Sequence, residues 1–133
     1  MIFKLVKEIK SKDGTLHFRR WRILSTPWFK FCLHAIYKAD DDVHLHNHPW
    51  NFWSFVLKGS YTERLPNFKL NPRFAGTWAY RQRDQFHKIE DLHSPVVYTF
   101  NVMWNFRNTW GYEVKGKYVD HETYRTMKRN NLL

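Results

Sequence analysis

The chain has 133 residues, with 22 Lys and Arg residues against 12 Asp and Glu residues, so its formal net charge is +10. Aromatic residues make up 19% and hydrophobic residues 43%, with 5 Gly and 5 Pro, which excludes a disordered or collagen-like chain and predicts one globular domain over residues 1–133. The single cysteine, Cys32, excludes an internal disulfide and a thiolate zinc site, so we expect a reducing, cytoplasmic setting.

The positive charge is concentrated toward the N-terminal end. Residues 1–38 hold nine basic and two acidic side chains, a net charge of +7. Such an excess favours an anionic partner, which could be a nucleic acid, a nucleotide-like substrate or an anionic lipid surface. No nucleic-acid-binding motif accompanies it, so a solvated basic sheet face is the preferred interpretation. Because neither a signal-peptide segment nor a run of about 18 apolar residues is present, we expect a soluble protein without a membrane partner.

The first third of the chain reads as strands. Residues 2–9 and 15–24 are predicted strands, and Asp13-Gly14 between them is a hairpin signal, so residues 1–27 form an N-terminal β-ribbon. In the second strand, alternation places Leu16, Phe18 and Arg20 on one face. Residues 28–37 are a further apolar strand, and we interpret its His34 as a core or edge histidine rather than a ligand.

Three histidines at alternate positions mark residues 43–50. They follow an acidic turn at residues 39–42, which lacks the glycine and distal glutamate of a calcium loop. On an extended strand, alternate side chains point to the same face, so His44, His46 and His48 are predicted to face one space. An apolar strand follows, and Gly59-Ser60 turns it into a hairpin with the strand that begins at Tyr61.

The rest of the chain is also predicted to be mostly β-structure. Residues 65–73 are an irregular connection, residues 81–85 are a polar bend before His87, and residues 96–106 are a buried strand. A closing hairpin spans residues 110–119, and Asp120 is the predicted N-cap of a helix over residues 121–130. About ten short strands favour an all-β sandwich or barrel over residues 28–119, followed by a C-terminal helix and tail over residues 120–133.

The histidine pattern suggests a metal site. Neutral imidazole is a common ligand of divalent metal ions, and two histidines at i and i+2 offer adjacent coordination positions. A third ligand must come from elsewhere, and the best candidate is His87, 41 positions after His46. Glu63 could add a carboxylate from the neighbouring hairpin strand. The alternative is that the imidazoles lie on an exposed edge, or hydrogen-bond inside a barrel that binds no metal.

At this point the sequence resembles the small cupin-like proteins of bacteria and phages. The resemblance covers roughly residues 30–120 and rests on an HxHPW segment, a VLxGxYxE hairpin, a downstream FHxI segment and a closing segment from Arg107 to Tyr112. In this chain the first three read His46-Asn47-His48-Pro49-Trp50, Val56-Leu57-Lys58-Gly59-Ser60-Tyr61-Thr62-Glu63 and Phe86-His87-Lys88-Ile89. It implies a cupin-type double-stranded β-helix, or jelly-roll barrel, with His46, His48 and His87 clustered in its mouth as metal ligands.

The chain departs from the general cupin pattern at one position. That pattern has a glutamate four residues after the second histidine and a glycine seven further on; Gly59 is present, but the glutamate position is Phe52. The usual fourth ligand is therefore missing. Either Glu63 or His44 replaces it, or the site is a three-histidine centre with open positions.

We therefore expect a metal-dependent cupin enzyme, with a non-haem iron(II)-type oxygenase acting on a small anionic substrate as the leading hypothesis. Fe2+ is the favoured ion, with Ni2+, Mn2+ or Zn2+ as alternatives. Glu63 and His44 are the predicted catalytic groups, and Arg81, Arg83 and Trp50 are the predicted substrate contacts, since Arg81, Arg83 and His87 share strand parity.

Other functions remain open from the sequence. The chain could be a non-catalytic module that binds a small ligand or nucleic acid, or a metal-independent epimerase or isomerase in which a histidine acts as base. A lyase or isomerase with a metal is close behind the oxygenase. A homodimer that pairs through sheet edges is the expected assembly if the protein is not a monomer.

Overall fold

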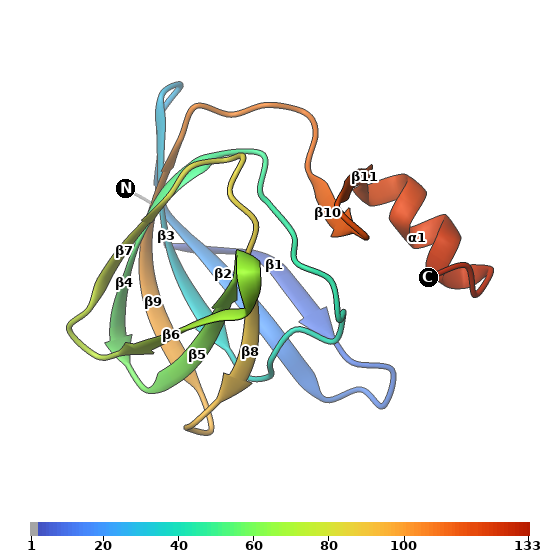
Figure 1. The fold of residues 1–133 in the computed structure, drawn as a ribbon. Coiled ribbons are helices and arrows are strands. Elements are labelled where there is room, and N and C mark those ends of the chain that lie inside the picture. The colour runs from blue at the N-terminus through green and yellow to red at the C-terminus, as the bar shows by residue number, and fades with distance from the viewer. Residues whose placement is uncertain (1–2) are drawn as a thin grey trace.

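The computed structural model describes residues 3–133, which form an open β-barrel with a C-terminal extension (Figure 1). The main sheet has six strands, in the order β1-β2-β3-β9-β4-β7. They are β1 (Lys4–Lys10), β2 (Leu16–Ser25), β3 (Phe29–Ile36), β9 (Val97–Trp104), β4 (Asn51–Lys58) and β7 (Trp78–Arg81). A smaller sheet, in the order β6-β5-β8, lies across from it and consists of β6 (Lys69–Phe74), β5 (Ser60–Leu65) and β8 (Lys88–Leu92).

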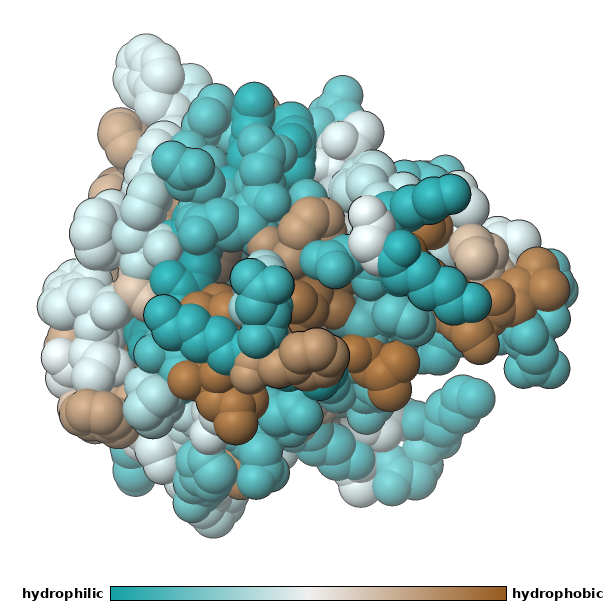
Figure 2. All heavy atoms as spheres, in the orientation of Figure 1, coloured by the Kyte–Doolittle hydropathy of each residue, from teal (hydrophilic) through white to brown (hydrophobic). Residues whose placement is uncertain are grey.

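The C-terminal extension lies to one side of the barrel in Figure 1. It comprises the hairpin β10 (Gly111–Val114) and β11 (Lys117–Asp120), followed by α1 (His121–Arg129). The predicted helix is confirmed, together with its N-cap, because the Asp120 side chain accepts hydrogen bonds from the backbone N–H groups of Glu122 and Thr123. Figure 2 shows hydrophobic side chains in the middle of an otherwise largely hydrophilic face, and again over the C-terminal end of the chain.

The predicted N-terminal ribbon is the edge of the main sheet. β1 pairs with β2 and β2 pairs with β3, all antiparallel, so the ribbon continues the barrel wall. The first residue of the predicted strand, Ile2, lies outside the described residues. The division into a ribbon, a barrel and a C-terminal tail stays a prediction.

The apolar core occupies one end of the barrel. Ile36, Val56, Tyr61 and Val97 are buried against one another where β3 ends, β9 begins and β4 turns into β5. That turn needs a glycine. Gly59 has a φ of 87°, and a Cβ atom there would lie 2.5 Å from the backbone oxygen of Val96. The cavity beyond this core is lined by both aromatic and polar side chains.

The prediction of a regular strand over residues 43–50 is wrong. Only His46 makes ladder contacts there, as an isolated bridge to His87 on one side and to Tyr112 on the other. The chain bends at Val43 and His44 and again at Pro49, so His44 does not share a face with the two histidines that follow. The bends break the alternation of side chains that a regular strand would have. Only His46 is left in an extended pairing, with His87 on one side and Tyr112 on the other.

Two further expectations need correction. The predicted irregular connection at residues 65–73 contains β6, an edge strand of the small sheet, where Pro72 is tolerated because an edge strand has backbone groups that need no ladder partner. The predicted strand parity of residues 81–87 is also wrong. β7 ends at Arg81 and residues 82–86 form a turn, so Arg81, Arg83 and His87 do not alternate on one strand.

Candidate metal centre

Three imidazoles converge at the histidine segment. One ring nitrogen from each of His46, His48 and His87 lies within 4.8 Å of the others, so the three could hold one metal ion. The Nε2 atoms of His48 and His87 are 2.9 Å apart. The rings of His46 and His48 meet edge to face, and each centroid lies 5.0 Å from that of His87.

Backbone pairing brings the distant histidine to the other two. His46 and His87 exchange both backbone hydrogen bonds, with N to O distances of 2.9 and 2.8 Å. Asn47, between the two ligand candidates, is 2% exposed and joins Gly111 of β10 through its backbone N–H and its side-chain oxygen. A Cβ atom at Gly111 would lie 2.2 Å from the backbone oxygen of Val119, so the pairing of β10 with β11 also requires a glycine here. The His46–His48 segment is therefore fixed from both sides.

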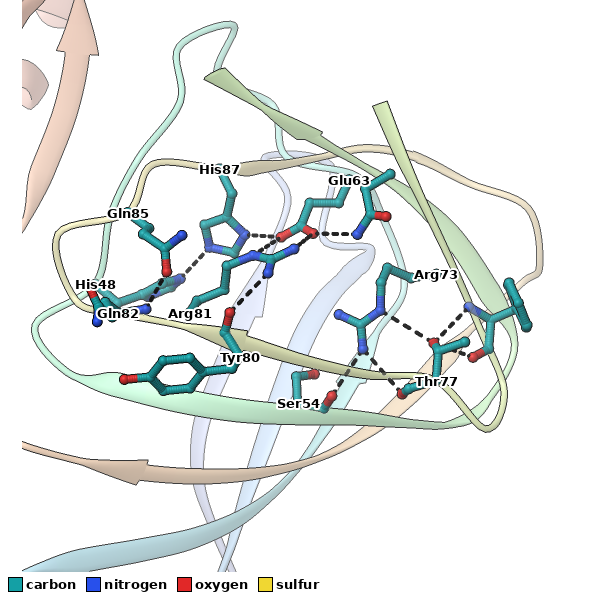
Figure 3. A network of polar contacts seen from close by, with 12 residues as sticks. His48, Ser54, Glu63, Arg73, Thr77, Tyr80, Arg81, Gln82, Gln85 and His87 are labelled. Carbon is teal, nitrogen blue, oxygen red and sulfur yellow. Dashed lines mark hydrogen bonds and ion pairs between the residues drawn. The ribbon is translucent and has the colours of Figure 1, made fainter. Parts of the chain in front are cut away.

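Glu63 lies behind His87, on the side away from His48 (Figure 3). His87 Nδ1 donates to Glu63 Oε2 at 2.7 Å, because an ionised carboxylate can only accept. In the neutral ring this leaves the lone pair on Nε2, the atom that faces His48. Carboxylates that accept from the second nitrogen of a ligating histidine fix its tautomer and orientation. Glu63 is thus placed to orient His87.

Arg81 completes this arrangement. Its guanidinium forms an ion pair with Glu63 through both carboxylate oxygens, and its Nε lies 3.2 Å from Oε2. Asn71 donates to the same carboxylate at 3.3 Å. Burial raises the pKa of Glu63, but the hydrogen bond from His87 and the Arg81 charge outweigh it and lower the pKa to about 2. The buried carboxylate is therefore ionised.

Two histidines of the cluster, His46 and His48, are held in the neutral form by their surroundings. Burial lowers the pKa of His46 to about 4, with a further contribution from His87. Burial also lowers the pKa of His48 well below its ordinary value, followed by the neighbouring His46 and His87. Neutral imidazole is the form that binds a metal ion, so this environment suits coordination.

A cavity of about 620 Å³ opens beside the cluster. His46, His48 and His87 line it, together with Trp50 and Phe52. Trp50 stacks on His48 with an interplanar angle of 18°, and Phe52 packs edge-on to His48. The position at which the cupin pattern has a carboxylate is therefore an aromatic wall. The three residues of the cluster are all histidines in the described part of the chain.

The other predicted site residues lie apart from the cluster. His44 Nδ1 is 2.9 Å from the Tyr124 hydroxyl of α1, which places its ring against the C-terminal extension. Arg83 donates from its side chain to the Asn105 carbonyl at 3.3 Å and from its backbone to Asn51. The cavity lining does not include His44, Arg83 or Arg81. Trp50 does line the cavity.

Two residues that the sequence analysis did not assign to the site lie on the cavity wall. Arg20 of β2 and His34 of β3 are direct partners in the sheet, and Arg20 Nε donates to His34 Nε2 at 2.9 Å. The available signal was the alternation of the second strand, which placed Arg20 on the face of Leu16 and Phe18. A basic residue on an apolar strand face is unusual, and its charge needs a partner or a ligand.

The donor set fits a divalent metal ion. The ligand atoms of the three histidines lie within 4.8 Å of one another, and a bound ion would replace the hydrogen bond between the Nε2 atoms of His48 and His87. Burial favours the neutral form of His46 and His48, His87 has the carboxylate partner typical of ligating histidines, and space adjoins the cluster. Residues 3–133 contain no helix that is long and apolar enough to span a membrane.

Comparison with known proteins identifies the fold. No protein-family model matches the sequence. No curated protein matches it either. A "putative mannose-6-phosphate isomerase" from Ralstonia eutropha JMP134 is similar in structure, with a TM-score of 0.60, 13% identity, and coverage of 66% of this chain and 84% of that one.

Two further solved structures are similar. HppE in its iron(II) form has a TM-score of 0.61 and 14% identity, and the match covers 78% of this chain and 60% of HppE. The DMSP lyase DddQ from Ruegeria pomeroyi DSS-3 has a TM-score of 0.59 and 9% identity, with coverage of 77% and 56%. This chain spans less than two thirds of these two proteins. At such identities the likeness concerns the fold, and the chain has the cupin-type β-barrel that its sequence predicts.

Proposed function

We propose that the protein is a metal-dependent cupin enzyme in which His46, His48 and His87 hold a divalent ion, with iron(II) favoured. The observation that carries this proposal is the convergence of three imidazoles beside a cavity of about 620 Å³. HppE, which is similar in fold, is described with iron(II), and this supports the choice of ion. Nickel, manganese and zinc remain alternatives because imidazole suits each of them.

The centre is proposed to have three histidine ligands. Glu63 faces Nδ1 of His87 and is bound by Arg81, so its role here is to orient His87 and to hold the proton on Nδ1. His44 contacts Tyr124, and Phe52 occupies the position at which a carboxylate ligand would be expected. The catalytic roles predicted for Glu63 and His44, and the substrate contacts predicted for Arg81 and Arg83, stay predictions.

A bound ion would supply open coordination positions at which a substrate, water or dioxygen is polarised. The protein contributes a shaped and partly enclosed space. Trp50 and Phe52 shield one side of the histidines from water, which strengthens electrostatic interactions in the cavity. The absence of a carboxylate leaves the centre more positive, and this favours an anionic substrate. Oxygenase is the favoured reaction, with isomerase or lyase as alternatives.

The proposal is tested by metal analysis of freshly purified protein, followed by removal of the metal with a chelator. We expect about one iron per chain, and consumption of dioxygen with small carboxylic or phosphorylated compounds that stops on chelation and returns with iron(II). Activity that persists unchanged after chelation would contradict the metal-dependent reaction and favour an isomerase with a histidine base. A different metal with no dioxygen uptake would exclude the oxygenase but retain the centre.

A further inference from the structure

Arg20 is a cation on the inner wall of the barrel that no acid neutralises. The register of the sheet sets it directly between Lys7 of β1 and His34 of β3, so the three side chains form a row on one face. Within residues 3–133, neither Lys7 nor Arg20 forms an ion pair with a carboxylate. Two adjacent like charges repel each other, and burial adds to the cost.

The other cations that line the cavity are already paired. Lys38 donates to the hydroxyl groups of Ser11 and Thr15, and Lys128 of α1 binds Asp42 at 2.6 Å. Lys38 Nζ also lies 4.0 Å from Asp13 Oδ1, so an acidic side chain of the protein faces each of these two charges. Arg20 and Lys7 differ because their counter-charge has to come from solvent or from a ligand.

The guanidinium of Arg20 is held in one orientation. Its Nε donates to His34 Nε2 at 2.9 Å, which requires an unprotonated Nε2, and burial lowers the pKa of His34 well below its ordinary value. The guanidinium carbon lies 5.2 Å from the centroid of the Trp50 ring and 5.5 Å from that of Phe18. These contacts fix the plane of the group before any ligand arrives, so little side-chain entropy is lost on binding.

The two terminal nitrogens of this guanidinium remain available. Among residues 3–133, Nε is the only side-chain atom of Arg20 that forms a hydrogen bond within the protein. The terminal nitrogens are not buried without a partner. A guanidinium presents its N–H groups in a fork that matches two oxygens of a carboxylate or phosphate. Arg20 therefore combines the requirements of a prepared anion site, namely a fixed plane, free donors and an uncompensated charge.

The charges in the cavity are also arranged asymmetrically. Asp42 accepts from Tyr112, the bridge partner of His46, whereas Arg20 lies over the Trp50 ring that stacks on His48. Asp42 is bound by Lys128 and Tyr112, and Asp40 accepts a hydrogen bond from the backbone of Ile89. The acidic groups thus have partners on the side of His46, and the free positive charge lies on the side of His48.

We propose that Arg20, with Lys7 beside it, binds the oxyanionic head group of a small substrate, a carboxylate or a phosphate, while the other end of that substrate reaches the histidine cluster. Trp50 contacts both Arg20 and His48, so it would wall the space between the two ends. That the ligand is a substrate rests on the proposed metal-dependent function. The anion site itself rests on Arg20 and requires no metal.

The test measures the affinity of the full-length protein for acetate and for inorganic phosphate at constant ionic strength, with and without chelator. Titration calorimetry and the NMR signal of the Arg20 Nε–H group provide two readouts. Arg20→Gln is expected to weaken binding by at least about tenfold, the scale of one charge-assisted hydrogen bond. Arg20→Lys should weaken it less, because it keeps the charge and loses the fork. Tighter binding of phosphate or of acetate identifies the head group, and acetamide should not bind.

Arg19→Gln is the matched control, since Arg19 is the adjacent arginine on β2 and pairs with Glu8 on the other face of the sheet. It should change the anion affinity by less than about twofold, because exposed charges are screened. Equal affinity in the wild type and both Arg20 variants would overturn the proposal, as would an equal loss in Arg19→Gln. Anion binding is also measured with chelator, and metal affinity is measured separately. If the protein binds the anion but no metal, the metal centre is rejected and the Arg20 site is retained.

Discussion

Two half-buried arginines of this barrel, Arg81 and Arg20, have opposite surroundings. Arg81 is bound to Glu63 through both oxygens, outside the cavity lining, and Glu63 in turn holds His87. Arg20 lines the cavity, has a neutral histidine as its hydrogen-bond partner and has no acid beside it among the described residues. Arg81 therefore has its counter-charge within the protein, whereas the proposed role of Arg20 is to take its counter-charge from a ligand. Replacing each arginine separates the two roles.

The largest effect is expected from Arg81→Met. It leaves the Glu63 carboxylate, which is 2% exposed, without its counter-charge. Removing one partner of a buried ion pair typically costs about 3–5 kcal/mol in the free energy of unfolding. Urea unfolding measures this directly. Arg19→Met, at an exposed pair, is the control and should change the stability little. An equal effect of both substitutions would contradict the structural role of Arg81.

The next effect concerns the metal affinity of Glu63→Gln. The amide keeps the shape of the side chain but loses the charge that fixes the Nδ1 proton of His87. Loss of such a partner lowers metal affinity by about 10–100-fold. Competition with a chromophoric chelator gives the affinity, and Glu8→Gln, which also removes an arginine-paired carboxylate, serves as the control. Unchanged affinity in Glu63→Gln would show that Glu63 has no part in orienting His87.

A smaller effect is expected for Arg20→Met in the absence of added anions. Its free energy of unfolding should stay close to that of the wild type or rise slightly. This substitution removes a buried and uncompensated charge, while it also removes the hydrogen bond to His34. The two contributions oppose each other, so the free energy of unfolding should change by no more than about 1 kcal/mol. A loss comparable to that of Arg81→Met would mean that Arg20 is structural, and the contrast between the two arginines would fail.

His44→Phe should have the least effect on the metal. The substitution removes the hydrogen bond to Tyr124 and so should destabilise the packing of α1 by about 1 kcal/mol. Metal affinity should stay within about twofold of the wild type, since His44 is outside the cluster. Thermal unfolding and metal titration on the same sample separate the two quantities. A large drop in metal affinity would place His44 in the centre after all.

Much of the fold followed from local pattern. Alternating hydrophobic residues, the Asp13-Gly14 and Gly59 turns and the Asp120 cap are short-range signals, and each appears in the structure at its predicted place. The grouping of His46, His48 and His87 came from the motif and its resemblance to cupin-like proteins. The structure brings these three side chains together as that resemblance implied.

The errors and omissions have a common physical cause, because they depend on long-range register and on bends. His44 left the predicted face because the chain bends at Val43 and His44, and Arg83 left it because residues 82–86 form a turn. The meeting of Arg20 with His34 depends on how β2 pairs with β3, including a register shift between Arg22 and Leu24. The direction of Glu63, toward Nδ1 of His87 and not into the cluster, is a matter of pairing between β5 and β8.

The central claim is that His46, His48 and His87 together form one metal centre, and metal titration of single variants tests it most directly. Iron(II) or its substitute cobalt(II) is titrated into the wild type and into His46→Ala, His48→Ala, His87→Ala and His44→Ala. The three cluster variants should each lose more than about 100-fold in affinity, beyond the loss typical of an outer partner. His44→Ala should bind like the wild type. Wild-type affinity in two or more of the cluster variants would contradict the account.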